Sequence, residues 1–178
     1  QSAHAVATVF GVEVAPDAEF TDPFTIDPPV EGEFRFARNF AAFQAAEPFA
    51  EPVTITNCDR EATFDAPPQR IITMNHHVTE TLIQMGAGDR IVGRAYADRD
   101  SEPLPEVADE MAAIPALADE YPTWEQIVDL DPDLVVGGMR SAFDEKEGRS
   151  RDTLESEGID TFLFSEYCGE GFPDLDML

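Results

Sequence analysis

The chain has 178 residues, which favours one domain and leaves room for two small ones. With 43% hydrophobic and 10% aromatic residues it can fill a core, so global disorder is excluded. Its 37 acidic and 11 basic residues give a formal net charge of −26, which repels phosphate backbones and anionic lipid head groups and argues against nucleic acid and membrane surfaces as partners.

Residues 1–52 differ in composition from the rest of the chain. They hold eight of the 13 phenylalanines and several prolines, which is too aromatic for an inert linker. We expect a Phe- and Pro-rich N-terminal extension over 1–52 and a folded domain over 53–178. Three roles for the extension stay open: packing on the main domain, pairing with another subunit, or partial disorder.

The regular part of the chain opens with a predicted β hairpin. Residues 53–57 and 62–64 have the composition of short strands, joined by a turn through 58–61. The apolar run 70–74 follows as the first buried strand. Apolar residues at helical spacing then predict a helix over 78–86. The glycines at its end are in the position of a helix cap, whereas a nucleotide fingerprint needs them between strand and helix.

The pattern of short strand and helix then continues to residue 164. A second strand is predicted over 90–95, and 98–120 is an acidic, Pro-punctuated connection with a helix around 105–111. Thr123 and Gln126 have the spacing of a capping box for a helix that reaches Leu130. The last predicted elements are a third strand (133–137), a helix (149–157) and a fourth strand (159–164). This alternation predicts an α/β fold with a parallel sheet flanked by helices, preceded by the hairpin.

The most informative site candidate is the polar turn after the first strand, Asn75, His76 and His77. Open α/β sheets bind ligands beyond the carboxyl ends of their strands, so a ligand is expected over this turn. Three interpretations of the histidines stay open: ligand contact without metal, a structural role in the turn, or metal binding. The other histidine, His4, is far away in sequence, so a closed metal site would have to recruit carboxylates.

Other candidates follow the remaining strands. Tyr121 and Trp124 bracket a helix start, where they could bind an anionic or ring-bearing ligand, or Trp124 could pack in the core. Arg140 either balances a local carboxylate or binds ligand oxygens in a bidentate manner. Tyr96 and Tyr167 occupy the corresponding places after the second and fourth strands.

The two cysteines, Cys58 and Cys168, lie far apart and form no CxxC motif. They are either two inert thiols or one long-range disulfide. Motifs of serine, metallo- and nucleotide-dependent enzymes are absent, so nothing in the sequence requires an enzyme. No stretch reaches the ~18 apolar residues of a membrane span.

Several segments together resemble the N-terminal lobe of solute-binding proteins of ABC transporters, of the iron-siderophore, haem and cobalamin type. The resemblance runs from about residue 53 to 168 and is closest to the actinobacterial form. Its motifs are TNC…ATFDAPPQRIITMN, TETLIQMGAGDRIVG, IPALADEYPTWEQIVDLDPDLVVGG, SAF…GRSRDTLESEGIDTFLF and EYC.

The resemblance implies a Rossmann-like lobe of a two-lobed protein, with the ligand between the lobes and the second lobe absent from this chain. It also implies a disulfide between Cys58 and Cys168, and a permease-docking role for Glu125, although an acid is common in a helix's first turn. The resemblance does not extend to residues 1–52. The implied ligand contacts are Asn75, His76, His77, Tyr96, Tyr121, Trp124, Arg140 and Tyr167.

The sequence therefore predicts an extracytoplasmic binding protein, periplasmic or a cell-surface lipoprotein, that captures a ferric-siderophore-like chelate for an ABC importer. We expect no resident cofactor or metal, no enzymatic activity, and membrane attachment only by a lipid anchor outside this chain. The alternatives are haem or cobalamin binding, a metal-dependent hydrolase that uses His76 and His77, and an interaction module assembled through residues 1–52.

Overall fold

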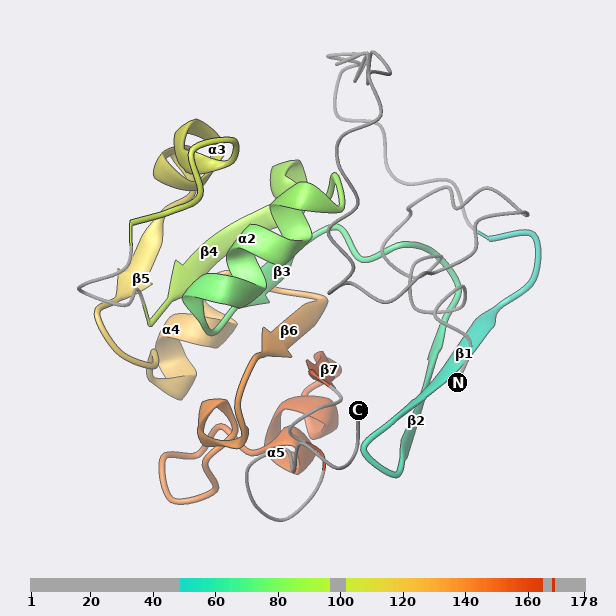
Figure 1. Cartoon of the computed structure of the whole chain (residues 1–178). Coiled ribbons are helices and arrows are strands. Elements are labelled where there is room, and N and C mark those ends of the chain that lie inside the picture. The colour runs from blue at the N-terminus through green and yellow to red at the C-terminus, as the bar shows by residue number, and fades with distance from the viewer. Residues whose placement is uncertain (1–48, 97–101, 165–167, 169–178) are drawn as a thin grey trace, which may run out of the picture.

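The computed structural model of the chain describes residues 49–96, 102–164 and Cys168. These residues form a two-stranded antiparallel sheet and a five-stranded parallel sheet with helices on both faces (Figure 1). The predicted α/β fold with a preceding hairpin is confirmed. Nearly all of the extension predicted over 1–52 lies outside the described residues, and so does Tyr167.

The antiparallel sheet is the predicted hairpin, made of β1 (Val53–Asn57) and β2 (Arg60–Phe64). Its turn is shorter than predicted, because β2 already begins at Arg60. Cys58 and Asp59 form the turn with φ angles of 53° and 63°, the left-handed conformation that two-residue hairpin turns of type I′ require. The hairpin turn therefore presents Cys58 at its tip.

The parallel sheet has the strand order β5-β4-β3-β6-β7. The chain runs outward from β3 through β4 to β5, then returns to place β6 on the other side of β3. The order thus reverses between β3 and β6, and such a switch point is where open α/β sheets bind ligands. The strands are β3 (Ile71–Thr73), β4 (Ile91–Ala95), β5 (Ala116–Ala118), β6 (Leu134–Gly137) and β7 (Asp160–Leu163).

Strand β5 is a fifth strand where the sequence predicted only a connection. Alanine has a low preference for strands, and β5 is a three-residue edge strand, so its sequence carries little signal. Backbone hydrogen bonds hold it at the edge: the Arg94 N–H donates to the Pro115 carbonyl (2.9 Å), and the Tyr96 N–H donates to the Glu120 carbonyl (3.1 Å). The second bond brings the ends of β4 and β5 together.

Helices cover both faces of the sheet. On one face α2 (His76–Gln84), α3 (Ala108–Ala113) and the hairpin pack on β3, β6 and β7; on the other lie α4 (Trp124–Val128) and α5 (Arg151–Ser156). Short 3-10 turns, η1 (Gly88–Arg90) and η2 (Arg140–Ala142), complete the described elements. None of the described helices is both long enough and apolar enough to cross a membrane. Fully buried residues of the two packed layers include Ile71, Val78, Leu134 and Val136 on the first face, and Ile72, Met74, Ile127, Val135 and Leu154 on the second.

The ends of the helices explain one correction to the sequence prediction. Helix α2 begins at His76 with Asn75 as its N-cap residue, so the two histidines form its first turn and do not lie in a loop before it. Gly86 (φ 81°) ends this helix as predicted, with the Ala87 N–H donating to the Leu82 carbonyl.

The capping box at the start of α4 is confirmed. The Gln126 N–H donates to Thr123 Oγ1 (3.3 Å), and the Thr123 N–H donates to Gln126 Oε1 (2.9 Å). Helix α5 begins two residues later than predicted, at Arg151, because Ser150 accepts the Thr153 N–H and caps it.

Candidate functional site

The segments after β3, β4, β5 and β6 meet at one edge of the parallel sheet, which we call the rim. Asn75, after β3, contacts both Tyr121, after β5, and Gly138, after β6. Tyr96, after β4, stacks on Tyr121. The ends of β3, β4, β5 and β6 thus converge; three of these strands were predicted from the sequence, and β5 was not.

Asn75 bridges the switch point between β3 and β6. Its side chain is buried (2% exposed), and its Oδ1 accepts the Gly138 N–H at 2.9 Å. Its Nδ2 donates to the Tyr121 hydroxyl at 3.1 Å. Both ends of the amide are engaged by protein groups, so Asn75 fixes the relative positions of three segments of the rim.

Tyr121 is the second fixed point of the rim. Its ring stacks on that of Tyr96, with centroids 4.6 Å apart and planes inclined by 28°. Its hydroxyl, which accepts from Asn75, is 2.9 Å from Ser141 Oγ. The buried Arg149 places its guanidinium 5.2 Å from the Tyr121 ring centroid, in the range of a cation–π contact, and its Nε donates to the Ala142 carbonyl (3.2 Å). Aromatic rings and an arginine therefore line this part of the rim.

His76 points toward its own helix. Its Nε2 is 3.3 Å from Glu80 Oε1, one helical turn later, with only 10% and 15% of the two side chains exposed. The contact has the distance of an ion pair but not the alignment of a hydrogen bond, and Nε2 has no hydrogen-bond partner among the described residues. Glu80 Oε1 also accepts the Leu104 N–H at 2.7 Å, which ties α2 to the segment before α3.

His77 lies over the switch point. Its ring meets Phe164, which follows β7, edge to face with centroids 5.7 Å apart. A Cβ added at Gly138 would be 2.2 Å from His77 Nε2, so the imidazole occupies the space that a side chain at residue 138 would need. The two histidines diverge, and no group of three or more His, Cys, Asp and Glu side chains in the described ranges is arranged to hold a metal ion.

The segment after β6 supplies the exposed part of the rim. Met139 is 39% exposed, and Arg140 begins η2 with an exposed side chain. Arg140 Nη2 donates to the Cys168 carbonyl at 2.6 Å. The sequence left open whether Arg140 balances a carboxylate or binds a ligand; the structure adds a protein carbonyl as its partner.

Trp124 and Glu125 belong to a groove beside the start of α4. Trp124 is partly buried against the core of that face, and its Nε1 is buried with no hydrogen-bond partner in the described part of the chain. Glu125 is exposed. The open groove has a volume of about 500 Å³ and is lined by Thr123, Trp124, Glu125, Lys146, Glu147, Gly148 and Thr153.

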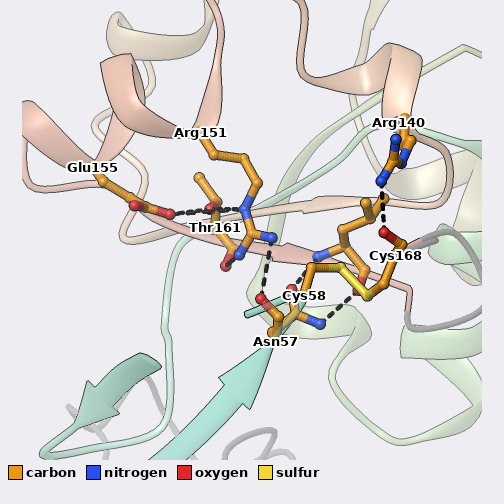
Figure 2. The surroundings of a disulfide bond; sticks show 8 residues. Asn57, Cys58, Arg140, Arg151, Glu155, Thr161 and Cys168 are labelled. Carbon is orange, nitrogen blue, oxygen red and sulfur yellow. Dashed lines mark hydrogen bonds and ion pairs between the residues drawn. A yellow bond between two sulfur atoms is a disulfide. The ribbon is translucent and has the colours of Figure 1, made fainter. Parts of the chain in front are cut away.

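A disulfide joins Cys58 at the hairpin tip to Cys168, with the two Cα atoms 4.9 Å apart across 110 residues of sequence (Figure 2). The predicted pairing is confirmed. Beside it, Asn57 Nδ2 donates to the Leu163 carbonyl (2.7 Å) and Asn57 Oδ1 accepts the Leu163 N–H (2.8 Å). The Asn57 amide thus pairs with β7 as a further strand would.

Charged side chains complete the attachment of the hairpin. The buried Arg151 of α5 donates from Nη1 to the Asn57 carbonyl (3.3 Å) and from Nε and Nη2 to Thr161 Oγ1 (2.7 Å) and the Thr161 carbonyl (3.1 Å) (Figure 2). Burial lowers the pKa of this guanidinium. Nearer the surface, Arg60 pairs with Asp152 (2.6 Å) and lowers the pKa of that carboxyl through a hydrogen bond.

Sequence reasoning missed three residues of the rim. Ser141 and Arg149 hold Tyr121, and Met139 is exposed between Gly138 and Arg140. A lone serine, arginine or methionine in a loop has no distinguishing pattern, and the sequence contained no signal for them.

The fold and the rim define an α/β lobe with a candidate ligand site at its switch point, and comparison with known proteins gives its family. The model of the periplasmic binding protein family matches residues 71–174, more than half of the chain. The chain therefore belongs to the periplasmic binding protein family, whose name implies an extracytoplasmic location. A search of curated proteins found no match.

Two solved structures show the relation in three dimensions. One is an ABC-type Fe3+-hydroxamate transport system from Saccharomonospora viridis, 33% identical, with a TM-score of 0.54; the match covers 67% of this chain and 41% of that one. The other is a periplasmic binding protein from Veillonella parvula, 19% identical, with a TM-score of 0.55, which supports the fold alone; it covers 65% of this chain and 38% of that one. This chain thus spans about two fifths of these proteins, which fits one lobe of a two-lobed protein.

Proposed function

We propose that this chain is the N-terminal lobe of a solute-binding protein that captures a ferric-siderophore-like chelate and delivers it to an ABC importer. The observation that carries the proposal is the rim: Asn75 and Tyr121 bring four strand ends together at the switch point, beside the exposed Arg140. The 33% identity to a protein named as an Fe3+-hydroxamate transport system supports this class of ligand.

The mechanism is binding without turnover. The guanidinium of Arg140 suits the oxygens of a chelate, because its N–H donors lie in one plane and can bind two oxygens at once. Met139 and the aromatic rings of Tyr96 and Tyr121 offer apolar contact to the organic part of the ligand. The net charge of −26 opposes strongly anionic chelates, so neutral or cationic ferric hydroxamates are favoured over ferric catecholates.

A calorimetric titration tests this function. Ferrichrome and ferrioxamine B are titrated into the protein, with the iron-free hydroxamates, haemin and cobalamin as comparisons. We expect one saturable site for the ferric hydroxamates, quenching of Trp124 fluorescence, recovery of the chelate unchanged, and weaker binding by Arg140→Gln. Haemin or cobalamin binding without hydroxamate binding would support the alternative ligands, and ester turnover with stoichiometric metal would support a hydrolase.

The surroundings of His76 and His77 bear on the choice between a ferric chelate and haem or cobalamin as the ligand. An axial ligand of haem or cobalamin needs an accessible ring nitrogen, yet His76 faces Glu80 and His77 packs on Phe164 over Gly138. The His76 side chain is only 10% exposed and Gly138 lies against His77 Nε2, so neither imidazole is readily accessible to a bound metal, and we place the ferric chelate first. His76 and His77 could still contact an organic ligand at the edge of the rim.

Delivery to an importer would use Glu125. This exposed residue in the first turn of α4 borders the groove beside the rim and could pair with basic residues of a permease, while a lipid anchor outside this chain would hold the protein at the membrane. We expect Glu125→Gln to reduce importer-dependent uptake without changing chelate affinity. Equal uptake with the unaltered protein and with Glu125→Gln would show that Glu125 takes no part in docking to the importer.

A further inference from the structure

A chain of hydrogen bonds runs along the rim from a buried backbone amide to an exposed hydroxyl. It starts at the Gly138 N–H, which donates to Asn75 Oδ1 at 2.9 Å. Asn75 Nδ2 donates in turn to the Tyr121 hydroxyl at 3.1 Å. That hydroxyl lies 2.9 Å from Oγ of Ser141, which is exposed in η2. The chain therefore connects the interior of the switch point with the surface of the rim.

Asn75 belongs to this chain rather than to the end of its own helix. The side-chain oxygen of an asparagine at a helix N-cap usually accepts an N–H of the first turn. Asn75 is the N-cap residue of α2, yet its side chain makes no capping hydrogen bond. Its oxygen accepts instead from Gly138, on the far side of the switch point. The amide thus serves the rim.

The direction of the first two hydrogen bonds follows from the chemistry of their groups. A backbone N–H can only donate, so the end of the Asn75 amide that meets Gly138 is the carbonyl oxygen. The other end is then the NH₂ group, which can only donate. The Tyr121 hydroxyl therefore accepts from Asn75.

The phenolic proton of Tyr121 is left for Ser141. Among the residues that the structure describes, the Tyr121 hydroxyl has two hydrogen-bond partners, the Asn75 amide and Ser141 Oγ. Because it accepts from the first, its single proton is satisfied by donation to the second. Ser141 Oγ then keeps a proton of its own, for which the described part of the chain offers no further acceptor.

We propose that Ser141 is a ligand-contact residue that donates a hydrogen bond to an oxygen of the chelate, with its direction set by Gly138, Asn75 and Tyr121. The inference rests on the proposed function, in which hydroxamate oxygens meet the rim. A hydroxyl that accepts from a phenol is polarised and becomes a better donor. At this place the rim therefore favours a ligand oxygen over a ligand N–H or O–H group. Asn75 and Tyr121 act here as positioning residues.

A double-mutant cycle tests the proposal. The variants are Ser141→Ala, Tyr121→Phe and their combination, each titrated calorimetrically with ferrichrome and ferrioxamine B. Ser141→Ala is expected to weaken binding about three- to tenfold, the loss of one hydrogen bond. In the Tyr121→Phe background the same substitution is expected to change affinity less than about twofold, because the phenylalanine ring keeps its packing but no longer orients the serine hydroxyl.

Ser156→Ala is the matched control. Ser156 is also exposed, but its Oγ donates to the Thr153 carbonyl (2.7 Å) at the end of α5. It precedes the start of β7, at the edge of the sheet opposite the rim, so its removal should leave chelate affinity unchanged. Full affinity in Ser141→Ala would overturn the proposal. Equal losses in the two alanine variants, or the same loss with and without the Tyr121 hydroxyl, would overturn it too.

NMR of the unliganded protein tests the direction of the chain separately. The Tyr121 hydroxyl proton is expected to exchange slowly and to show a strong nuclear Overhauser effect to the Ser141 β protons, and Ser141→Ala should speed its exchange. Absence of that effect rejects the proposed direction. If chelates bind but Ser141→Ala changes nothing, the contact fails and the proposed function stands. If no chelate binds, both fail, and the NMR result still decides how the hydroxyls are oriented.

Discussion

The segments of the rim and the β1–β2 hairpin are held in place by different kinds of interaction. At the rim, the hydrogen bonds between segments come from neutral groups: the Asn75 amide and the Tyr121 hydroxyl join segments that the neighbouring strands already bring close, and the Arg149 guanidinium adds a cation–π contact to Tyr121. Beyond the edge strand β7 the hairpin is held by a covalent bond, by the Asn57 amide and by the buried charge of Arg151. Loops between paired strands are positioned by sheet topology, whereas a hairpin outside the parallel sheet needs long-range attachments of its own.

The disulfide is expected to make the largest single contribution to this difference. Replacing Cys58 and Cys168 by serine, or reducing the bond, should lower the free energy of unfolding by about 4–5 kcal/mol, because the bond closes a loop of about 110 residues and restricts the unfolded chain. Urea unfolding measures the change. Reductant should have no effect on the serine variant, and an unchanged urea midpoint after reduction would show that the attachment does not depend on the covalent bond.

Arg151 tests the charged part of the hairpin attachment. Arg151→Met should lower the free energy of unfolding by about 3 kcal/mol, because the carbonyls of Asn57 and Thr161 lose a charged donor in a buried place. Arg60→Met is the control: it removes the surface ion pairs with Asp152 (2.6 Å) and Glu155 (2.9 Å), and should cost less than about 1 kcal/mol. Similar losses in both variants would contradict the distinction between buried and exposed charges.

Asn75 tests the neutral network of the rim. Asn75→Ala leaves the buried Gly138 N–H without its acceptor and removes the donor to Tyr121, so a loss of about 1–3 kcal/mol in the free energy of unfolding is expected. Ser141→Ala, which removes one bond from the same hydroxyl at an exposed position, should cost clearly less. Chemical denaturation of the two variants, with the disulfide intact, compares them directly. An Asn75→Ala loss no greater than that of Ser141→Ala would show that the switch point is held by the backbone alone.

The same contrast explains what the sequence predicted and what it did not. Apolar runs such as that around Ile72 and Val135, and caps such as Thr123 with Gln126, are local signals, and they located four of the five parallel strands and the start of α4. Strand β5 was missed because its three residues, Ala116–Ala118, derive their conformation from pairing with β4 rather than from their own preference.

At the candidate site, the sequence placed residues on the rim but not their partners. Asn75 and Tyr121 were predicted as ligand contacts, which stays a prediction, and the structure adds a hydrogen bond between them across 46 residues of sequence. Such a pair is created by the strand order, which no local pattern encodes. His77 over Gly138 is a similar case, since the contact depends on β3 and β6 being neighbours.

Asp160 gives the smallest expected effect and tests the charge balance of β7. Burial, together with repulsion from Glu155 and Asp133, raises the pKa of its carboxyl. A raised pKa in the folded state means that the fold favours the protonated form, so this contribution to stability is present at low pH and is lost as the pH rises through the raised pKa. Asp160→Asn should therefore raise the free energy of unfolding at pH 7 by less than about 0.5 kcal/mol, and the gain should disappear near pH 3.

Asp152→Asn is the control of opposite sign. The Arg60 hydrogen bond lowers the pKa of Asp152, so this substitution should reduce the free energy of unfolding at pH 7. It should have no effect at a pH where the carboxyl is protonated in both the folded and the unfolded state. Thermal unfolding across this pH range measures both. A loss of stability in Asp160→Asn at neutral pH would mean that the charged carboxylate supports β7, contrary to the crowding of acids around it.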